Sequence, residues 1–322
     1  MKRIVVTGGT GYVGSELVKQ LVARGDRVTV LTRGLSAEGN PRHVTWNPYE
    51  LGDWAAAFDG ADAVVNLVGE QALGVRYTAA RKRRIRDSRL VPTENVVQAL
   101  SAASVKPAVL VSASGVNYYG AHPASERVDE SFGPGDDFLA RLCVEWEAAS
   151  EKARDLGIRV VNPRLSPVIG PDDASLGILT ALYKLLLGRP LGSRGSLLRL
   201  MTLPFKLFVG GPIGSGAQGF SWIQLDDAVA ALTRCIDDPG MPAKVNLCSP
   251  NPVTNLEVSR AIATALGRPC WFPVPAFALR VLFGEGAEPI LTGQFVVSGA
   301  LHRSPLQLAY SHVEEAVADA LE

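Results

Sequence analysis

Residues 1–14 read Met1-Lys-Arg-Ile-Val-Val-Thr-Gly-Gly-Thr-Gly-Tyr-Val-Gly14, and this stretch decides the fold. An apolar strand pattern ends in a turn that carries Gly8, Gly11 and Gly14, and apolar residues at helical spacing follow directly. Strand, glycine turn and helix in this order begin a dinucleotide-binding βαβ unit. Gly8 permits the tight turn, Gly11 lets the backbone approach a pyrophosphate, and Gly14 lets the helix pack closely on the strand.

The start of this helix is the predicted phosphate site. A helix N-terminus offers free N–H groups and a partial positive charge to an anion. The alternative is a plain glycine turn without a ligand. The predicted cofactor contacts in the turn are Gly8, Thr10, Gly11, Tyr12, Val13 and Gly14.

The second predicted strand, 27–33, indicates which dinucleotide binds. An Asp or Glu ends this strand in sites that prefer NAD, where it binds the ribose 2′-hydroxyl. Here the strand ends in Thr32-Arg33-Gly34. No carboxylate repels a 2′-phosphate, and a guanidinium is placed to bind one. We therefore expect NADP(H); the alternative is that Arg33 is only a solvated charge.

Composition sets the class of protein. The chain has 322 residues, 47% of them hydrophobic, which suits one large α/β unit with an added lobe. With 32 basic and 32 acidic residues the net charge is zero, which argues against a general nucleic-acid binder. The four cysteines are far apart and lack CxxC spacing, so we expect reduced thiols in a cytoplasmic protein, with no disulfide or metal site. We expect no signal peptide and no transmembrane segment; a homodimer is one option for the assembly.

Strand and helix patterns alternate through the first half of the chain. This predicts an α/β fold: a Rossmann-type doubly wound parallel sheet with a smaller, discontinuous C-terminal lobe. We expect the NADP-binding domain at 1–165 and 220–248, and the substrate lobe at 166–219 and 249–322. The further expected strands are 61–68, 107–112, 157–162 and 244–248, and the expected helices include 93–102, 138–156 and one that ends near 236.

The predicted lobe contains three features that point to a ligand. The apolar segment 197–209 is too short and too interrupted to span a bilayer, and we expect it to cover an apolar pocket and not to lie on a membrane. The loop 210–219 is rich in glycine, and we assign Gln218 and Trp222 to substrate binding. The pair Asp226-Asp227 could serve as a metal or acid/base site, but it precedes a helix, so we favour an N-cap role.

Catalytic hydroxyls are expected in the loop Val111-Ser-Ala-Ser-Gly-Val-Asn-Tyr-Tyr-Gly120. At the end of a sheet strand they are suited to polarising a carbonyl or an alcohol. We take Ser114, Tyr118 and Tyr119 as the candidates. The alternative is that the serines satisfy backbone groups in a turn and the tyrosines complete the core.

Together these motifs resemble the extended short-chain dehydrogenases/reductases, and within them the NAD-dependent epimerase/dehydratase-like branch that carries a C-terminal domain of unknown function. The resemblance implies a Rossmann-like fold, NADP(H) binding and a discontinuous substrate lobe. It adds Leu67, Val68, Gly69 and Ser112 to the expected cofactor contacts. The segments that carry it are 7–14, 66–70, 82–89, 112–120, 138–147, 218–227, 245–254, 268–275 and 282–294.

One departure from the superfamily affects the expected chemistry. Its active members carry Tyr and Lys four residues apart on the helix after the serine loop, where Tyr is the acid/base and Lys lowers its pKa. Here Phe138 or Leu139 stands for the Tyr, and Leu142 or Cys143 for the Lys. Arg141 is too basic to act as an acid. The replacements are Tyr118 or Tyr119 with Ser114, or one of two glutamates, Glu145 and Glu147, that otherwise form ion pairs on the helix.

Two functions follow from these observations. The first is an NADP(H)-dependent oxidoreductase or epimerase that acts on a small, partly hydrophobic carbonyl, alcohol or sugar-like substrate. The second is a non-catalytic NADP(H)-binding sensor or scaffold. The missing Tyr/Lys pair favours the second, and the Gly-rich loop, Trp222 and the apolar segment favour the first.

Overall fold

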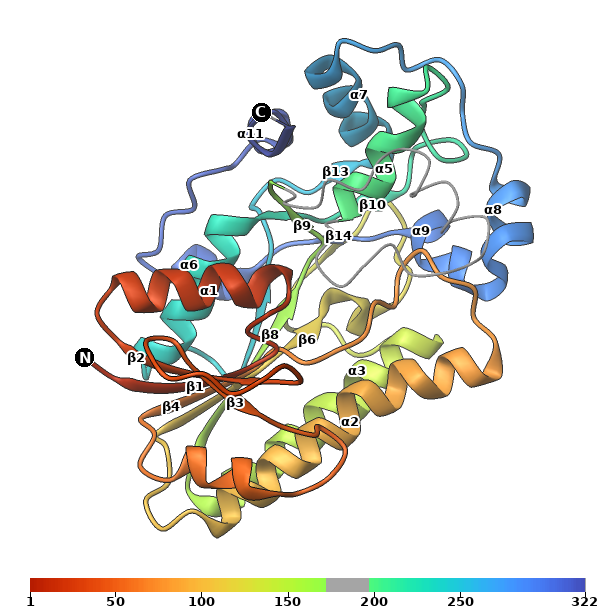
Figure 1. Cartoon of the computed structure of the whole chain (residues 1–322). Helices are drawn as coiled ribbons and strands as arrows, with labels where there is room; N and C mark the ends of the chain where they lie inside the picture. Colours follow the sequence, from red (N-terminus) through yellow and green to blue (C-terminus); the bar gives the residue numbers. More distant parts are fainter. Residues whose placement is uncertain (172–196, 322) are drawn as a thin grey trace.

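A parallel β-sheet forms the centre of the molecule (Figure 1). The computed structural model describes residues 1–171 and 197–321. The strand order is β3-β2-β1-β4-β5-β8-β12, and every pairing along it is parallel. The strands are β1 (Arg3–Thr7), β2 (Arg27–Thr32), β3 (Arg42–Thr45), β4 (Ala63–Asn66), β5 (Val109–Ser112), β8 (Arg159–Leu165) and β12 (Lys244–Leu247), and the short β6 (Ser114–Gly115) also pairs with β8.

Helices cover both faces of the sheet, as Figure 1 shows. Alternate residues of β1 separate the two cores: Ile4 and Val6 pack with α1 and α6, whereas Val5 packs on the side of α2. A strand buried on both faces must be apolar throughout, which is why the first strand is a continuous hydrophobic run. The doubly wound fold class is thereby confirmed. The helices are α1 (Tyr12–Ala23) and α6 (Leu225–Asp237) on one face, and α2 (Ala79–Ala102) and α3 (Phe138–Glu151) on the other.

Most of the remaining elements lie beyond the carboxyl ends of the strands, whereas α10 (Gly299–Arg303) packs against β12. Their core contains Trp222 and joins α5, α7 and α11, while α8 and α9 flank it (Figure 1). Ala300 and Leu301, which the expected division places in the lobe, pack in the core of the sheet. The exact division into domains stays a prediction. The elements are α5 (Leu197–Lys206), α7 (Asn255–Leu266), α8 (Ala276–Phe283), α9 (Glu288–Thr292), α10 (Gly299–Arg303), α11 (Val313–Leu321), and the pairs β9 (Val168–Ile169) with β11 (Ile223–Gln224), β10 (Gly219–Phe220) with β13 (Val253–Thr254), and β7 (Arg127–Val128) with β14 (Phe295–Val296).

Several expected boundaries differ from the structure. The helix expected at 93–102 is the second half of α2, which continues through Pro92. The helix expected at 138–156 changes at Lys152 to a 3₁₀ helix, η3 (Lys152–Leu156). The strand expected at 157–162 continues to Leu165, past Pro163. Two elements, β3 and the 3₁₀ helix η1 (Asp53–Phe58), were not expected, because a short edge strand has a weak apolar pattern.

Most side chains of the basic cluster Arg81-Lys-Arg-Arg-Ile-Arg86 on α2 form ion pairs with acids of the protein. Arg81 and Arg84 pair with Glu70, and Arg86 pairs with Glu145 on α3. This helix face is therefore satisfied within the protein. In the two described ranges, no helix combines the length and hydrophobicity needed to cross a membrane.

Candidate functional site

The glycine turn is fixed by close backbone packing. Gly8 has φ +73°, and a Cβ there would lie 2.7 Å from the Leu67 carbonyl oxygen. A Cβ on Gly14 would lie 2.2 Å from the Gly8 carbonyl oxygen, whereas one on Gly11 would meet the same oxygen at 3.2 Å. The backbone packing around Gly8 and Gly14 therefore leaves no space for a side chain at either position. Gly11 is less crowded, which leaves room beside it for a ligand.

The N-terminus of α1 suits an anion. Gly11 is its N-cap and provides no side-chain cap, and the first turn contains no acidic residue. Thr10 is exposed, and Tyr12 and Val13 are half-buried. The helix dipole is therefore not offset by a local carboxylate, which fits the phosphates of a dinucleotide.

Arg33 lies just beyond the end of β2, next to β1 in the sheet. It is exposed, and no described residue forms a hydrogen bond or ion pair with its side chain. A guanidinium without a protein partner is available to a phosphate. The residues present therefore fit a phosphorylated dinucleotide.

Buried hydrogen bonds join the carboxyl ends of three neighbouring strands. The Thr7 hydroxyl donates to Asn66 Oδ1 at 2.7 Å, and Asn66 Nδ2 donates to Thr93 Oγ1 at 2.9 Å and to Ser112 Oγ at 3.2 Å. Asn66 and Ser112 are fully buried. The predicted cofactor contact Ser112 thus holds strand ends together, while Leu67–Gly69 follow β4 beside the glycine turn.

A second buried network, the Glu147–Arg164 network, contains two of the predicted catalytic residues. Arg164 donates from Nε to Glu147 Oε1 at 2.8 Å and from Nη2 to Oε2 at 2.9 Å, and both side chains are almost fully buried. The Ser114 hydroxyl donates to Glu147 Oε1 at 2.8 Å. Arg164 Nη1 donates to the Tyr119 hydroxyl at 2.9 Å, and this hydroxyl donates to Asn246 Oδ1 at 2.8 Å.

The network limits what these hydroxyls can do. Burial raises the pKa of Tyr119 to about 12, so its proton is held firmly at neutral pH. Tyr118 is half-buried, with the Arg164 guanidinium 3.4 Å from the centre of its ring. The catalytic role of Ser114, Tyr118 and Tyr119 stays a prediction.

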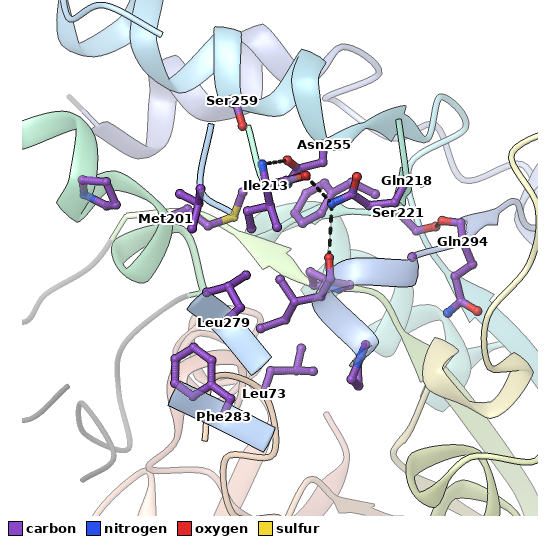
Figure 2. Close-up of a pocket in the computed structure, with 18 of the residues that line it drawn as sticks. Leu73, Met201, Ile213, Gln218, Ser221, Asn255, Ser259, Leu279, Phe283 and Gln294 are labelled. Atoms are coloured by element: carbon purple, nitrogen blue, oxygen red, sulfur yellow. Dashed lines mark hydrogen bonds between the residues drawn. The ribbon is translucent and has the colours of Figure 1, made fainter. Parts of the chain in front are cut away.

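A cavity of about 310 Å³ lies at the carboxyl end of the sheet. It reaches the sheet through Val116, Asn117 and Pro167. Figure 2 shows Leu73, Met201, Leu279 and Phe283 among its apolar side chains. Ligands of open α/β sheets bind beyond the carboxyl ends of the strands, so this is the candidate substrate site. Ser114, Tyr118 and Tyr119 are not among its described lining residues, whereas Asn117, in the same loop, is.

The apolar segment lines this cavity, as expected. Met201, Leu203, Pro204 and Phe205 of α5 form part of its wall. The side chain of Gln218 also lies there, donating from Nε2 to the carbonyl oxygens of Ile213 and Ile290 at 3.1 and 3.4 Å.

Trp222 is placed differently from Gln218. Its side chain is fully buried in the core of α5, α7 and α11, and its indole N–H donates to the Asn251 carbonyl oxygen at 3.0 Å. It is absent from the described lining of the cavity, which corrects our placement of it beside a substrate. Trp222 packs in the core because an aromatic side chain of this size stabilises the fold most when it is fully buried.

The Asp226-Asp227 pair is not an N-cap. Gln224 caps α6, accepting from the backbone N–H groups of Asp226 and Asp227. Asp227 instead accepts from the N–H groups of Ala309 and Tyr310 at 2.7 and 3.0 Å, which fixes the C-terminal segment on α6. Within the described ranges, no group of three or more His, Cys, Asp or Glu side chains is arranged to hold a metal ion.

The face of α3 that carries Tyr and Lys elsewhere is apolar here. Leu139, Leu142 and Cys143 are all buried. Burial raises the pKa of the Cys143 thiol to about 11. Leu139 and Leu142 cannot transfer a proton, and the raised pKa keeps the Cys143 thiol protonated at neutral pH. Of the two glutamates, Glu145 forms an exposed ion pair with Arg86, while Glu147 is buried with Arg164.

Sequence reasoning missed Arg164 and Asn117. An arginine inside the apolar run of β8 signals a buried charge that needs a partner, and that signal was readable. Asn117 lies between Ser114 and Tyr118, which are candidates because of their hydroxyls, and nothing in the sequence distinguishes Asn117 as a residue that lines the cavity.

Comparison with known families agrees with the fold. The model of the NAD dependent epimerase/dehydratase family matches residues 4–248. The chain belongs to this family. A second model, of a domain of unknown function (DUF1731), matches residues 274–320, which confirms the expected C-terminal domain.

Two relatives and two solved structures illustrate this membership. Epimerase family protein Mb2239 of Mycobacterium bovis is 37% identical over 98% of this chain and 96% of its own length. The chloroplastic SDR39U1 homolog of Arabidopsis thaliana is 35% identical over 98% and 85%. The crystal structure of human epimerase family protein SDR39U1 with NADPH has a TM-score of 0.81 and 30% identity, covering 99% of both chains. A nucleoside-diphosphate sugar epimerase from Corynebacterium glutamicum has a TM-score of 0.76 and 29% identity, covering 99% of this chain and 58% of that one.

Proposed function

We propose that this family member binds NADP(H) and uses it to interconvert a carbonyl and an alcohol on a small, partly hydrophobic molecule. The observation that carries the proposal is Arg33, exposed and without a partner among the described residues, beside a helix N-terminus that has no acid in its first turn. Human SDR39U1, which shares the fold, was crystallised with NADPH.

The cofactor, when bound, supplies or accepts the hydride. The protein supplies the surroundings: Arg33 and α1 bind phosphates, and the cavity holds the substrate at the carboxyl end of the sheet. Asn117 is the polar side chain of the 112–120 loop that lines the cavity, and its amide N–H can donate to a carbonyl oxygen. Reduction adds the hydride to the carbon and a proton to the oxygen; an epimerase would remove and return the hydride at the same carbon.

In this proposal Ser114 and Tyr119 are positioning residues. Their bonds to Glu147 and Arg164 hold the loop that presents Asn117. Tyr118, whose hydroxyl has no described hydrogen-bond partner, is the candidate to pass the proton.

Cofactor affinity tests the proposal directly. Arg33→Ala should weaken NADPH binding roughly ten- to a hundred-fold and leave NADH binding nearly unchanged, because a charged hydrogen bond is worth about 1.5–3 kcal/mol. Dissociation constants for both cofactors would be measured by calorimetry. Arg27→Ala, an exposed arginine at the other end of β2, is the matched control. Equal losses of affinity for NADPH and NADH would show that Arg33 does not contact the 2′-phosphate.

A non-catalytic NADP(H) sensor is the second candidate, favoured by the apolar face of Leu139, Leu142 and Cys143. A screen of carbonyl compounds that follows NADPH absorbance separates the two. Tight NADPH binding without turnover on any compound class would support the sensor.

A further inference from the structure

The described lining of the cavity contains no ionisable side chain. There is no Asp, Glu, His, Cys, Tyr, Lys or Arg among those residues. An anion taken from water into such surroundings loses its hydration without gaining a countercharge. A bound diphosphate needs cations or free backbone N–H groups, and the side chains described here offer no cation.

The N-terminus of α7, which lies at the cavity, is also closed to phosphate. Asn255, the first residue of α7, lines the cavity. However, Thr254 and Glu257 form a complete capping box there, with the Glu257 carboxylate accepting from the Thr254 N–H at 2.6 Å. The cap satisfies N–H groups and adds a negative charge, so this N-terminus repels an anion.

Several polar groups of the cavity are already committed to the protein, whereas Gln294 Oε1 is buried without a hydrogen-bond partner in the described part of the chain. Figure 2 shows Gln218, Ser221 and Asn255 on the side opposite Leu279 and Phe283. Gln218 Nε2 donates to two carbonyl oxygens, the Ser221 hydroxyl donates to the Gln294 carbonyl oxygen at 2.9 Å, and Asn255 Oδ1 accepts from the Ile213 N–H at 2.7 Å. A sugar with many hydroxyls would leave several of them without partners, which is costly in a buried site.

The rim of the cavity at α8 is apolar and exposed. Leu282 lines the cavity and is 48% exposed, and its neighbour Val281 is 69% exposed. Exposed apolar patches of this kind mark binding surfaces. An apolar ligand would thus meet a matching surface before it enters.

We infer that the cavity binds a neutral, mainly apolar ligand with one oxygen function, and that it excludes sugar nucleotides. The apolar body packs against α5 and α8, and the oxygen function lies toward Asn117 at the sheet. The inference deepens the proposed function and rests on it for the view that this cavity holds the substrate.

A matched pair of probes tests the ligand class. Farnesol and farnesyl diphosphate share one apolar body and differ in the diphosphate. With the full-length protein saturated with NADPH, which cannot oxidise an alcohol, farnesol should bind at least tenfold more tightly than farnesyl diphosphate in calorimetry, and UDP-glucose should not displace it. Tighter binding of the diphosphate, or displacement by UDP-glucose, would overturn the inference.

Two substitutions on α8 locate the bound ligand. Leu279→Glu places a charge on the cavity wall and should lower the affinity for farnesol at least tenfold. Phe277→Glu, on the exposed side of the same helix, should change this affinity less than twofold. Leu279→Trp, which fills the cavity without a charge, should also weaken farnesol and serves if the glutamate variant does not fold. Equal effects at Leu279 and Phe277 would place the ligand elsewhere.

NADPH affinity separates the two proposals. The affinity for NADPH should be unchanged in Leu279→Glu, Phe277→Glu and Leu279→Trp. This result would show that the fold and the cofactor site are intact. If the native protein fails to bind NADPH, the proposed function fails, whether or not farnesol binds. If NADPH binds with the expected dependence on Arg33 while farnesol does not bind, the proposed function stands and the ligand class is wrong.

Discussion

Two neighbouring regions at the carboxyl edge of the sheet use polar chemistry in opposite ways. The Glu147–Arg164 network buries a complete ion pair with the hydroxyls of Ser114 and Tyr119. The cavity next to it has no ionisable side chain in its described lining. The difference teaches that the buried charges at this edge of the sheet hold strands and loops in place, while the described wall of the cavity stays neutral. In the proposed function, the hydride accordingly belongs to the cofactor and the hydrogen bond to the substrate oxygen to the neutral amide of Asn117.

Removing one charge from the network should have the largest effect. Glu147→Gln leaves Arg164 buried without its counterion, and we expect a loss of about 3–5 kcal/mol in the free energy of unfolding. Glu145→Gln, two residues earlier on α3, breaks only an exposed pair with Arg86 and should cost about 0–1 kcal/mol. Urea unfolding of both variants measures the difference. Similar small losses in the two would show that the buried network does not hold this edge of the sheet.

The next effect distinguishes two glycines of the cofactor turn. Gly14→Ala puts a Cβ against the Gly8 carbonyl oxygen and should cost roughly 1–3 kcal/mol of stability. Gly11→Val should fold with nearly native stability but abolish NADPH binding, because its side chain occupies the approach of the pyrophosphate. Thermal unfolding and NADPH titration of both variants give the two readouts. Normal NADPH binding by the Gly11 variant would refute the assigned turn.

A smaller effect is expected in the cavity. Asn117→Ala removes a neutral hydrogen bond to the substrate oxygen, so kcat/KM should fall roughly fivefold, which corresponds to about 1 kcal/mol. The same assay on Tyr118→Phe tests the proposed proton donor. Should Tyr118→Phe lose activity while Asn117→Ala does not, the region of the Glu147–Arg164 network takes part in the chemistry and the contrast drawn above breaks down.

The last prediction concerns the reactivity of the cysteine thiols and involves no change in the stability of the protein. All four cysteines are free thiols; Cys143, Cys235 and Cys248 are buried, and Cys270 is half-buried. Burial raises the pKa of Cys143 to about 11 and of Cys235 to about 12, so both should stay unreactive at pH 8. We expect an aromatic disulfide reagent to titrate Cys270 in the native protein and all four thiols in urea. Rapid native labelling of Cys143 would show that solvent reaches the face of α3 where the Tyr/Lys pair is missing.

Much of the fold could be read from the sequence, because its determinants are local. The glycine spacing and the apolar runs of β1, β4 and β5 specify strand, turn and helix within a few residues. Boundaries were less certain: Pro92 lies inside α2 and Pro163 inside β8, since tertiary packing outweighs the local cost of a proline. The resemblance to the epimerase branch was carried by motifs along most of the chain, and family comparison confirmed it.

The site was predicted less completely, because its members come from distant segments. The sequence singled out Ser114 and Tyr119 for their hydroxyls but could not show that Glu147 and Arg164 bind those hydroxyls. It favoured Asp226 and Asp227 as a cap, whereas Gln224 caps α6 and Asp227 holds a segment more than eighty residues away.

By itself, then, the sequence determined the dinucleotide turn, the parallel sheet and the basic residue at the end of β2, because backbone sterics and apolar periodicity act between residues close in the chain. Only the tertiary structure decided which polar groups face a ligand. Asn117 lies in the cavity wall and Tyr119 is buried in the Glu147–Arg164 network, although they are two residues apart, because burial and hydrogen-bond partners depend on where β8, β12 and α8 pack.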